Sequence, residues 1–233
     1  MWRDDEPQIF RGPSVDYRVQ YTYPGPGPVT SSRELFDLTI AVLALAAIFG
    51  MPQMRQAYLV GWGWGIVLMF YAIALVAVML SVFPHELAHK FIARSHGYWA
   101  EFRRSDTWLA IGLFMSVVGF GFVAAPGAVM IRGNVTDEDN GKISAAGPLT
   151  NAIVGFSFFP ITILLASFPI AEYIGMYVVF VSALLGAFNM LPIAPFDGSK
   201  VWTWNKGAYI GLLLLLLSLL VISEMRFHFL GIL

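Results

Sequence analysis

The sequence contains no cysteine, which excludes disulfides, cysteine nucleophiles, iron–sulfur clusters and zinc sites built on thiolates. Histidine is also scarce, and the chain holds four: His85, His89, His96 and His228. Four histidines are too few for a membrane di-iron oxygenase. Any transition-metal site must therefore combine a few of these histidines with carboxylates.

Charged residues are also scarce in the sequence. Only 12% of the 233 residues are charged, against about 25% in soluble proteins. Hydrophobic residues make up 58%, and several apolar runs are long enough to span a bilayer. We therefore expect an integral, multi-pass protein that contacts the lipid bilayer. The net charge is −1, so a nucleic-acid partner is not expected.

Residues 1–33 lack the apolar stretch of about 7–15 residues that marks a signal peptide. We predict a cytoplasmic N-terminal segment here, either solvated or with one small strand at 15–21. The prolines and glycines of 24–28 then break the chain. Residues 34–233 are predicted to form one membrane-embedded domain.

That domain is predicted to be all-α and polytopic, with about five transmembrane helices. The expected helices are 35–50, 62–83, 146–166, 173–194 and 208–222. The stretch Thr30-Ser31-Ser32 can cap the first helix, and Pro148 suits the first turn of the third. Residues 98–103 alternate in the manner of a strand. The connections are expected at 51–61, 132–142 and 167–172.

The motif His85-Glu86-Leu87-Ala88-His89 lies at the end of the second predicted helix. Residues four apart share one helical face, so both imidazoles can bind one ion, and Glu86 can act as a general base towards water. Alternatively, the histidine pair only caps an interfacial helix. Ionisable groups at the border of the hydrocarbon are expensive and usually functional, so the sequence favours a metal site.

Asp197 is the best candidate for a third ligand. Pro192 and Pro195 cannot continue a regular helix, so we expect Asp197 on an unwound segment, with Gly198 permitting a sharp turn behind it. Two histidines and one carboxylate leave a fourth position open, as in catalytic zinc sites. A solvated loop carboxylate is the alternative for Asp197.

Other ligand schemes fit less well. An extended motif of the metzincin type needs glycine and histidine where this chain has Ile92 and Ser95. Glu101 and Glu138 could serve a thermolysin-like scheme, but both lie among other charges, and we expect them to be solvated. The remaining two histidines are predicted to be structural.

If His85, His89 and Asp197 meet at one ion, they lie at one depth, and the number of full membrane crossings between them must be even. Three apolar segments intervene: 108–131, 146–166 and 173–194. The first is interrupted by glycine and proline. We predict that 108–131 is a re-entrant helix–strand hairpin, which enters and leaves on the same side.

The distribution of basic residues supports this hairpin. With it, 12 of the 14 lysines and arginines lie on the active-site side, against 9 if 108–131 crosses fully. The positive-inside rule then places the active site near the cytoplasmic face of the cell membrane.

Three motifs together resemble the site-2 protease family of intramembrane zinc metalloproteases. They are the HELAH sequence at 85–89, Gly-Pro-Leu-Thr-Asn at 147–151, and the series Asn189, Pro192, Asp197 and Gly198. The resemblance covers about residues 62–200. It implies a three-helix catalytic core and cleavage of the transmembrane segments of membrane-protein substrates.

The resemblance also implies roles for individual residues. His85, His89 and Asp197 would bind one zinc ion, and Glu86 would be the base. Asn189 matches an asparagine near the metal, where its amide could donate to an oxyanion; the alternative is a helix–helix hydrogen bond. Asn151 is expected to tie helices together.

Two departures concern how substrates reach the site: the insertion at 108–131 is longer than a minimal core needs, and one helix follows Gly198. Two alternatives stay open. A protease of the Ste24 type would take Glu172 as a ligand, although Glu172 lies at a turn on the wrong side. A non-proteolytic scaffold or transporter would hold a structural metal. The sequence gives no oligomeric state.

Overall fold

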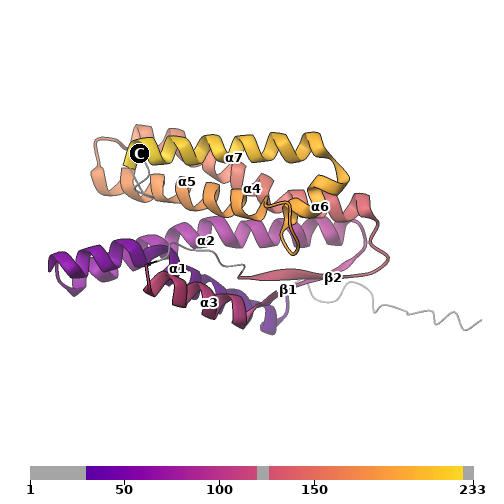
Figure 1. Ribbon diagram of the computed structural model, residues 1–233, viewed down its shortest axis with the longest axis horizontal. Coiled ribbons are helices and arrows are strands. Elements are labelled where there is room, and N and C mark those ends of the chain that lie inside the picture. The colour runs from indigo at the N-terminus through magenta and orange to yellow at the C-terminus, as the bar shows by residue number, and fades with distance from the viewer. Residues whose placement is uncertain (1–29, 120–125, 228–233) are drawn as a thin grey trace, which may run out of the picture.

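The structure, a computed structural model, describes residues 30–119 and 126–227. The strand predicted at 15–21 and His228 lie outside the described residues. Five long helices run side by side along the long axis of the molecule (Figure 1). They are α1 (Ser32–Val60), α2 (Trp64–Ser95), α4 (Asp137–Leu164), α5 (Pro169–Asn189) and α7 (Lys206–Phe227). Each is long and apolar enough to cross a membrane, which confirms the prediction of a multi-pass helical protein.

Four short elements complete the described fold: β1 (Trp99–Arg104), α3 (Asp106–Val117), β2 (Gly127–Arg132) and α6 (Asp197–Trp204). The two strands pair antiparallel, with Arg104 opposite Gly127. The chain therefore leaves and re-enters the bundle at one end, which is also the end that carries α6 (Figure 1). With 12 residues, α3 extends about 18 Å and is too short to span a bilayer. The predicted helix–strand hairpin is confirmed, and its depth in a membrane remains a prediction.

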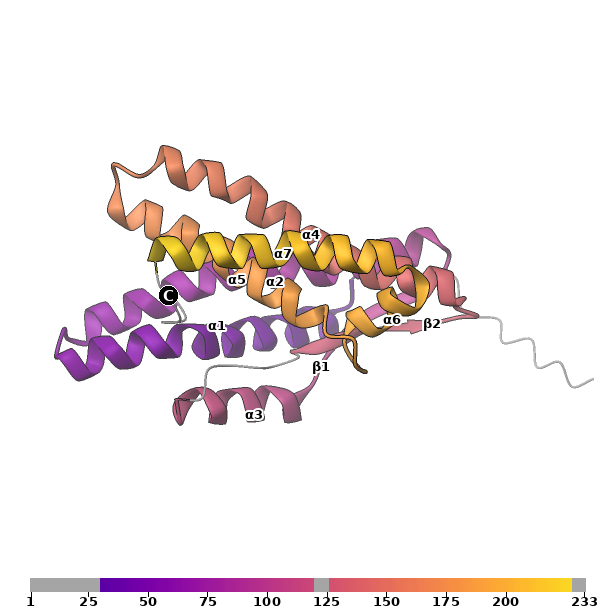
Figure 2. The same cartoon turned by 45° about the horizontal axis from the view of Figure 1, so that its top comes forward.

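Three of the long helices, α2, α4 and α5, pack against one another and form the centre of the bundle. The main core joins α1, α2 and α5 around buried residues such as Leu45, Val78 and Tyr177. A second cluster, with Ala152 and Leu216, seals α4 against α7. The short α3 packs against α1, on the side away from α7 (Figure 2).

The start of α1 agrees with the prediction, because Ser31 Oγ accepts a hydrogen bond from Glu34 N at 3.1 Å. The predicted loop at 51–61 is wrong, because α1 continues as a helix to Val60. Pro52 lies inside this helix and cannot supply the N–H that would bind the carbonyl of Ile48. Ser116 Oγ of α3 donates to that carbonyl instead, at 2.9 Å. A distant side chain thus compensates for the local helix breaker.

The predicted start of the third long helix is also wrong. α4 begins at Asp137, so Pro148 lies in its interior and not in its first turn. Thr136 caps this helix by accepting a hydrogen bond from Asp139 N at 3.1 Å. Three acidic residues fill its first turn, where the helix dipole favours negative charge. Part of the polar segment predicted as a connection is therefore helical.

Two other boundaries differ from prediction. α2 continues past Phe83 to Ser95, with Pro84 inside it, so the HELAH motif lies within the helix and not at its end. α5 begins at Pro169, so most of the predicted turn at 167–172 is its first turn. Both helices extend beyond the predicted apolar runs at these ends and include ionisable residues there, such as Lys90 in α2 and Glu172 in α5.

Candidate metal centre

The two histidines of the motif lie on one face of α2 and are buried there, with exposed fractions of 2% for His85 and 6% for His89. His89 Nδ1 donates a hydrogen bond to the carbonyl oxygen of Ile143 in α4, at 2.7 Å. This bond leaves Nε2 of the neutral ring as a free lone pair, which is the form that binds a metal. The helix packing therefore selects the tautomer of His89.

Asp197 reaches the same place from the other side of the site. α5 ends at Asn189, and seven non-helical residues, 190–196, carry the chain to the start of α6. Asp197 is the first residue of α6, so the expectation that it lies on an unwound segment is wrong, although the unwound segment directly precedes it. Gly198 allows close packing: a Cβ there would lie 2.2 Å from the carbonyl oxygen of Met190.

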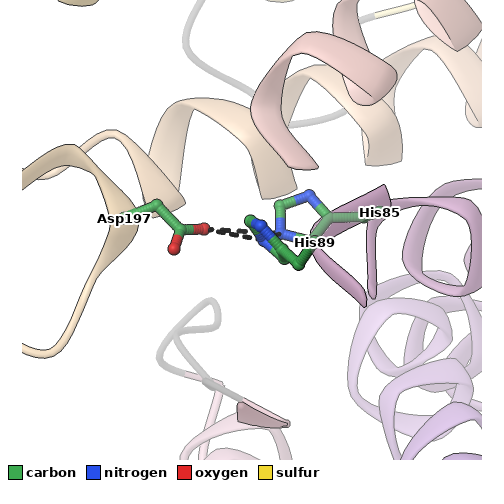
Figure 3. Close-up of side chains that lie close together, drawn as sticks. All are labelled: His85, His89 and Asp197. Atoms are coloured by element: carbon green, nitrogen blue, oxygen red, sulfur yellow. Dashed lines mark hydrogen bonds and ion pairs between the residues drawn. The ribbon is translucent and has the colours of Figure 1, made fainter. Parts of the chain in front are cut away.

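The three side chains converge on a common point (Figure 3). Nε2 of His85 lies 3.0 Å from Nε2 of His89. Oδ2 of Asp197 lies 3.1 Å from Nε2 of His89 and 3.6 Å from Nε2 of His85. Ligands placed tetrahedrally at about 2.0–2.1 Å from a zinc ion are about 3.3 Å apart. The donor atoms and their separations therefore fit one zinc ion with a fourth position open.

This cluster borders a cavity of about 360 Å³. Glu86, 8% exposed, lines the cavity together with the three candidate ligands and with residues 127–131 of β2. The predicted base and the predicted ligands thus share one space with the hairpin. A peptide segment that entered the cavity would meet all of them.

Asn189 also lines the cavity, at the end of α5. Its Nδ2 donates to the carbonyl oxygen of Leu185 in its own helix, at 3.1 Å. The carboxamide nitrogen carries a second hydrogen. The structure places Asn189 beside the site, and the predicted donation to an oxyanion remains a prediction.

Two neighbours of the cluster were not predicted to act there. Lys200 Nζ lies 3.6 Å from Oδ1 of Asp197, one turn further along α6. Lys200 was not predicted from the sequence, because α6 was not predicted. The only local signal was the i, i+3 spacing of Asp197 and Lys200, which brings them together on a helix. Gly147 of α4 faces the imidazoles, and a Cβ there would lie 2.3 Å from Nε2 of His89. Its position in the 147–151 motif was the only available signal.

The carboxylates considered as alternative metal ligands are not part of the cluster and bind other side chains. Glu138 is exposed and pairs with Lys142 at 2.6 Å. Glu172 forms an ion pair with Arg226 at 2.6 Å. The expectation that Glu101 is solvated is wrong, because its side chain is mostly buried and binds Ser31 and Arg103. Burial alone would raise the pKa of Glu101, but the hydrogen bonds from these two partners lower it.

His96 lies outside the cluster, with its Nε2 3.6 Å from Asp139 Oδ1. It approaches the carboxylate that Tyr98 and Thr136 also bind. This contact joins the end of α2 to the start of α4 and is consistent with the structural role predicted for His96.

Comparison with known proteins gives several relatives that match most of the chain. A protein of Methanocaldococcus jannaschii, MJ0611, whose name marks it as a candidate zinc metalloprotease, is 40% identical over 176 residues. The match covers 75% of this chain and 86% of that relative.

Two more distant relatives carry similar names. Zinc metalloprotease MJ0392 of the same organism is 25% identical over 69% of this chain and 39% of its own length. Rip3 of Mycobacterium tuberculosis, again named as a candidate zinc metalloprotease, is 28% identical over 74% of this chain and 38% of its own length. No family model matches the sequence. No solved structure matches it.

Proposed function

This chain belongs to the site-2-protease-like family of zinc metalloproteases, and we propose that it hydrolyses peptide bonds in or near the transmembrane segments of membrane proteins. One observation carries the proposal. His85, His89, Asp197 and Glu86 meet at one cavity, at one end of a bundle of five apolar helices. A water-using site in such a bundle suits a substrate that is itself held in the bilayer.

We propose that the three converging side chains hold one zinc ion. Zinc bound there would act as a Lewis acid towards a substrate carbonyl and would increase the acidity of water. Lys200 keeps Oδ1 of Asp197 turned towards α6, so that Oδ2 faces the histidines. Ile143 holds His89 in the ligand form.

Glu86 is the proposed general base and acid. Its carboxylate takes a proton from the attacking water as the new C–O bond forms, and it returns this proton to the nitrogen as the C–N bond breaks. Glu86 lies beside His85 on α2 and on the cavity wall. This position gives its carboxylate access to the oxygen of the attacking water and to the nitrogen of the peptide bond. Asn189 is proposed to use its second amide hydrogen to stabilise the oxyanion.

The hairpin is the proposed receiver of the substrate. Phe102 N of β1 donates to Glu34 Oε1 at 3.0 Å, so Phe102 and Val129 form a pair that exchanges no ladder hydrogen bonds. The backbone N–H and C=O of Val129 therefore point away from β1, to the outer edge of β2. An unwound substrate segment could add there as a strand, next to the cavity.

Substitution of Glu86 by glutamine tests the protease function. Glu86→Gln is expected to retain zinc and to lose cleavage of a model transmembrane substrate by at least about 100-fold. Zinc content is measured by metal analysis of the purified protein, and cleavage by gel electrophoresis. Glu138→Gln, an exposed change of the same kind, serves as the control and should behave like wild type.

The same assays separate this proposal from a metal-containing scaffold. A scaffold would retain zinc in wild type and cleave nothing. Asp197→Ala should lose most of its zinc, and full retention would exclude Asp197 as a ligand. Undiminished cleavage by Glu86→Gln would contradict the mechanism.

A further inference from the structure

The face of α4 that covers the two histidines carries Ile143, Gly147 and Asn151. These residues are spaced four apart and so share one side of the helix. Gly147 leaves room for the imidazoles, because a Cβ there would lie 2.6 Å from Nε2 of His85 as well as 2.3 Å from Nε2 of His89. This glycine lets α4 come close enough to α2 for polar groups on either side of it to touch the rings.

On one side of Gly147, the contact is complete. His89 Nδ1 donates to the carbonyl oxygen of Ile143 at 2.7 Å. On the other side stands Asn151, fully buried at 0% exposure. Its carboxamide is within interaction range of the His85 ring. The two imidazoles thus face equivalent positions of α4, one turn before and one turn after the glycine.

The second contact contains both polar groups, the His85 ring and the Asn151 carboxamide, but they form no hydrogen bond of good geometry. His85 Nδ1 is buried without a hydrogen-bond partner, and so are Oδ1 and Nδ2 of Asn151. Among the described residues, the one other buried side-chain atom in this condition is Oε1 of Gln53, in α1. Buried polar atoms in proteins are almost always paired. A ring nitrogen that carries a hydrogen and an amide oxygen have complementary requirements, and the carboxamide of Asn151 interacts with the His85 ring.

We propose that Asn151 is a positioning residue for His85: its Oδ1 accepts the Nδ1 hydrogen and so fixes the ring with Nε2 facing the metal position. This inference rests on the proposed metal-binding function of His85. Asn151 does for one ligand what the Ile143 carbonyl does for the other. Such partners of metal-binding histidines commonly affect metal affinity about 10- to 100-fold.

A purely structural role for Asn151 fits the contacts less well. A residue that ties helices together needs a polar partner on the neighbouring helix, as Ser81 and Ser182 show with their buried contact of 2.7 Å between α2 and α5. Towards α5, Asn151 meets Gly186, which has no side chain. The polar side chain with which its carboxamide interacts is the His85 imidazole.

The test compares zinc affinities by competition with a chelator, using purified full-length protein without substrate. Asn151→Leu has nearly the same size but cannot accept a hydrogen bond, and zinc binding should weaken about 10- to 100-fold. Asn151→Asp keeps an acceptor at the same place and should bind zinc about as tightly as wild type. Asn151→Ala, which leaves a small cavity in place of a branched side chain, gives a second loss variant should leucine prevent folding.

Ser182→Ala is the matched control, because it removes a buried contact between helices that does not involve the histidines. It should lower the melting temperature of the metal-free protein and leave zinc affinity unchanged. Wild-type affinity in folded Asn151→Leu or Asn151→Ala would overturn the proposal. An equal loss in Asn151→Asp, or in Ser182→Ala, would overturn it as well.

These outcomes are independent of proteolysis. If wild type binds zinc but cleaves no substrate, the proposed protease function fails and the role of Asn151 stands. If Glu86→Gln loses cleavage while the Asn151 variants bind zinc normally, the role of Asn151 fails and the protease function stands. Wild-type protein that binds no zinc would overturn both.

Discussion

Single atoms decide whether a metal fits between α2, α4 and α6. The three donor atoms of the cluster all lie within 4.8 Å of one another, and Gly147 is the residue of α4 that leaves space beside them. A side chain of any size at 147 would occupy the region of the two Nε2 atoms. The size of the residue at 147 therefore controls whether the ligands can meet.

We expect Gly147→Ala to weaken zinc binding at least about 10-fold, because either α4 or the imidazoles must move. The measurement is the zinc content and zinc affinity of the purified variant. Gly211→Ala in α7 is the control, since no heavy atom lies within 4 Å of a Cβ built there. Unchanged zinc affinity in Gly147→Ala would show that the rings can shift without cost and would remove this constraint.

The sequence predicted part of this site and not the rest. The i, i+4 spacing of His85 and His89 is local information, and the prolines before Asp197 marked where a second element could approach. The positions of Gly147 and Lys200 relative to the cluster depend on how α4 and α6 pack, which no local pattern encodes. The structure brings the predicted ligands together, and their binding of zinc remains a prediction.

At the scale of elements, the first turns of α1 hold the hairpin in place. Ser31, Glu34 and Asp37 are spaced three apart on one face, and they bind, respectively, Glu101, the N–H of Phe102 and the Arg104 guanidinium. Glu34 also binds Lys90, the residue after His89. Glu34 and Lys90 are 1% and 2% exposed, so this buried ion pair joins α1, α2 and β1.

Removal of one partner should destabilise the fold strongly. Glu34→Leu leaves the Lys90 ammonium buried and unpaired, and should lower the free energy of unfolding by about 3–5 kcal/mol. The double variant with Lys90→Met removes both charges and should recover much of this loss. Denaturant unfolding in detergent micelles measures both. A double variant no more stable than Glu34→Leu would show that the ion pair is not the cause.

The compensation at Pro52 gives a second test at this scale. Ser116→Ala leaves the carbonyl oxygen of Ile48 buried without a partner and should cost about 1–3 kcal/mol of unfolding free energy. Pro52→Ala restores the helical N–H, so in that background Ser116→Ala should cost much less. Ser218→Ala, on the exposed face of α7, is the control and should be within about 0.5 kcal/mol of wild type. An equal cost of Ser116→Ala in both backgrounds would contradict the compensation.

Helix boundaries were the least predictable feature, because packing between elements that are distant in sequence can compensate for a local helix breaker. Pro52 and Pro148 are helix breakers by local chemistry, yet both lie inside long helices. For Pro52 the missing bond is replaced by Ser116, which is 64 residues away in sequence and could not be identified without the packing of α3 against α1. The existence of five apolar helices, in contrast, follows from length and composition alone.

At the scale of the whole molecule, the candidate metal ligands and the candidate base lie at one end of the helix bundle. β1, β2 and α6 lie at the end where α2 finishes and α4 begins, and the α1–α2 and α4–α5 connections lie at the other (Figure 1). The even number of crossings required by a shared metal predicted this arrangement, because the two helices α4 and α5 together return the chain from the depth of His89 to the same depth at Asp197. The orientation of the bundle in a membrane rests on the excess of lysine and arginine at the active-site end.

The absence of cysteine makes that orientation directly measurable, since each introduced thiol is the only one in the chain. Ser95→Cys at the end of α2 and Glu138→Cys at the start of α4 lie on either side of the hairpin, and Ser167→Cys lies in the α4–α5 connection; all three positions are exposed. An impermeant maleimide applied to intact cells should label Ser167→Cys alone. The other two should react only after the membrane is permeabilised.

The pattern of labelling separates the hairpin from the orientation. If Ser95→Cys and Glu138→Cys react from opposite sides, residues 108–131 cross the membrane and the hairpin cannot be re-entrant, so that Asp197 would need another route to the histidines. If both react from outside while Ser167→Cys is protected, the hairpin stands and the bundle is inverted. The active site would then face away from the cytoplasm. That outcome would contradict the positive-inside rule, which places the side rich in lysine and arginine in the cytoplasm.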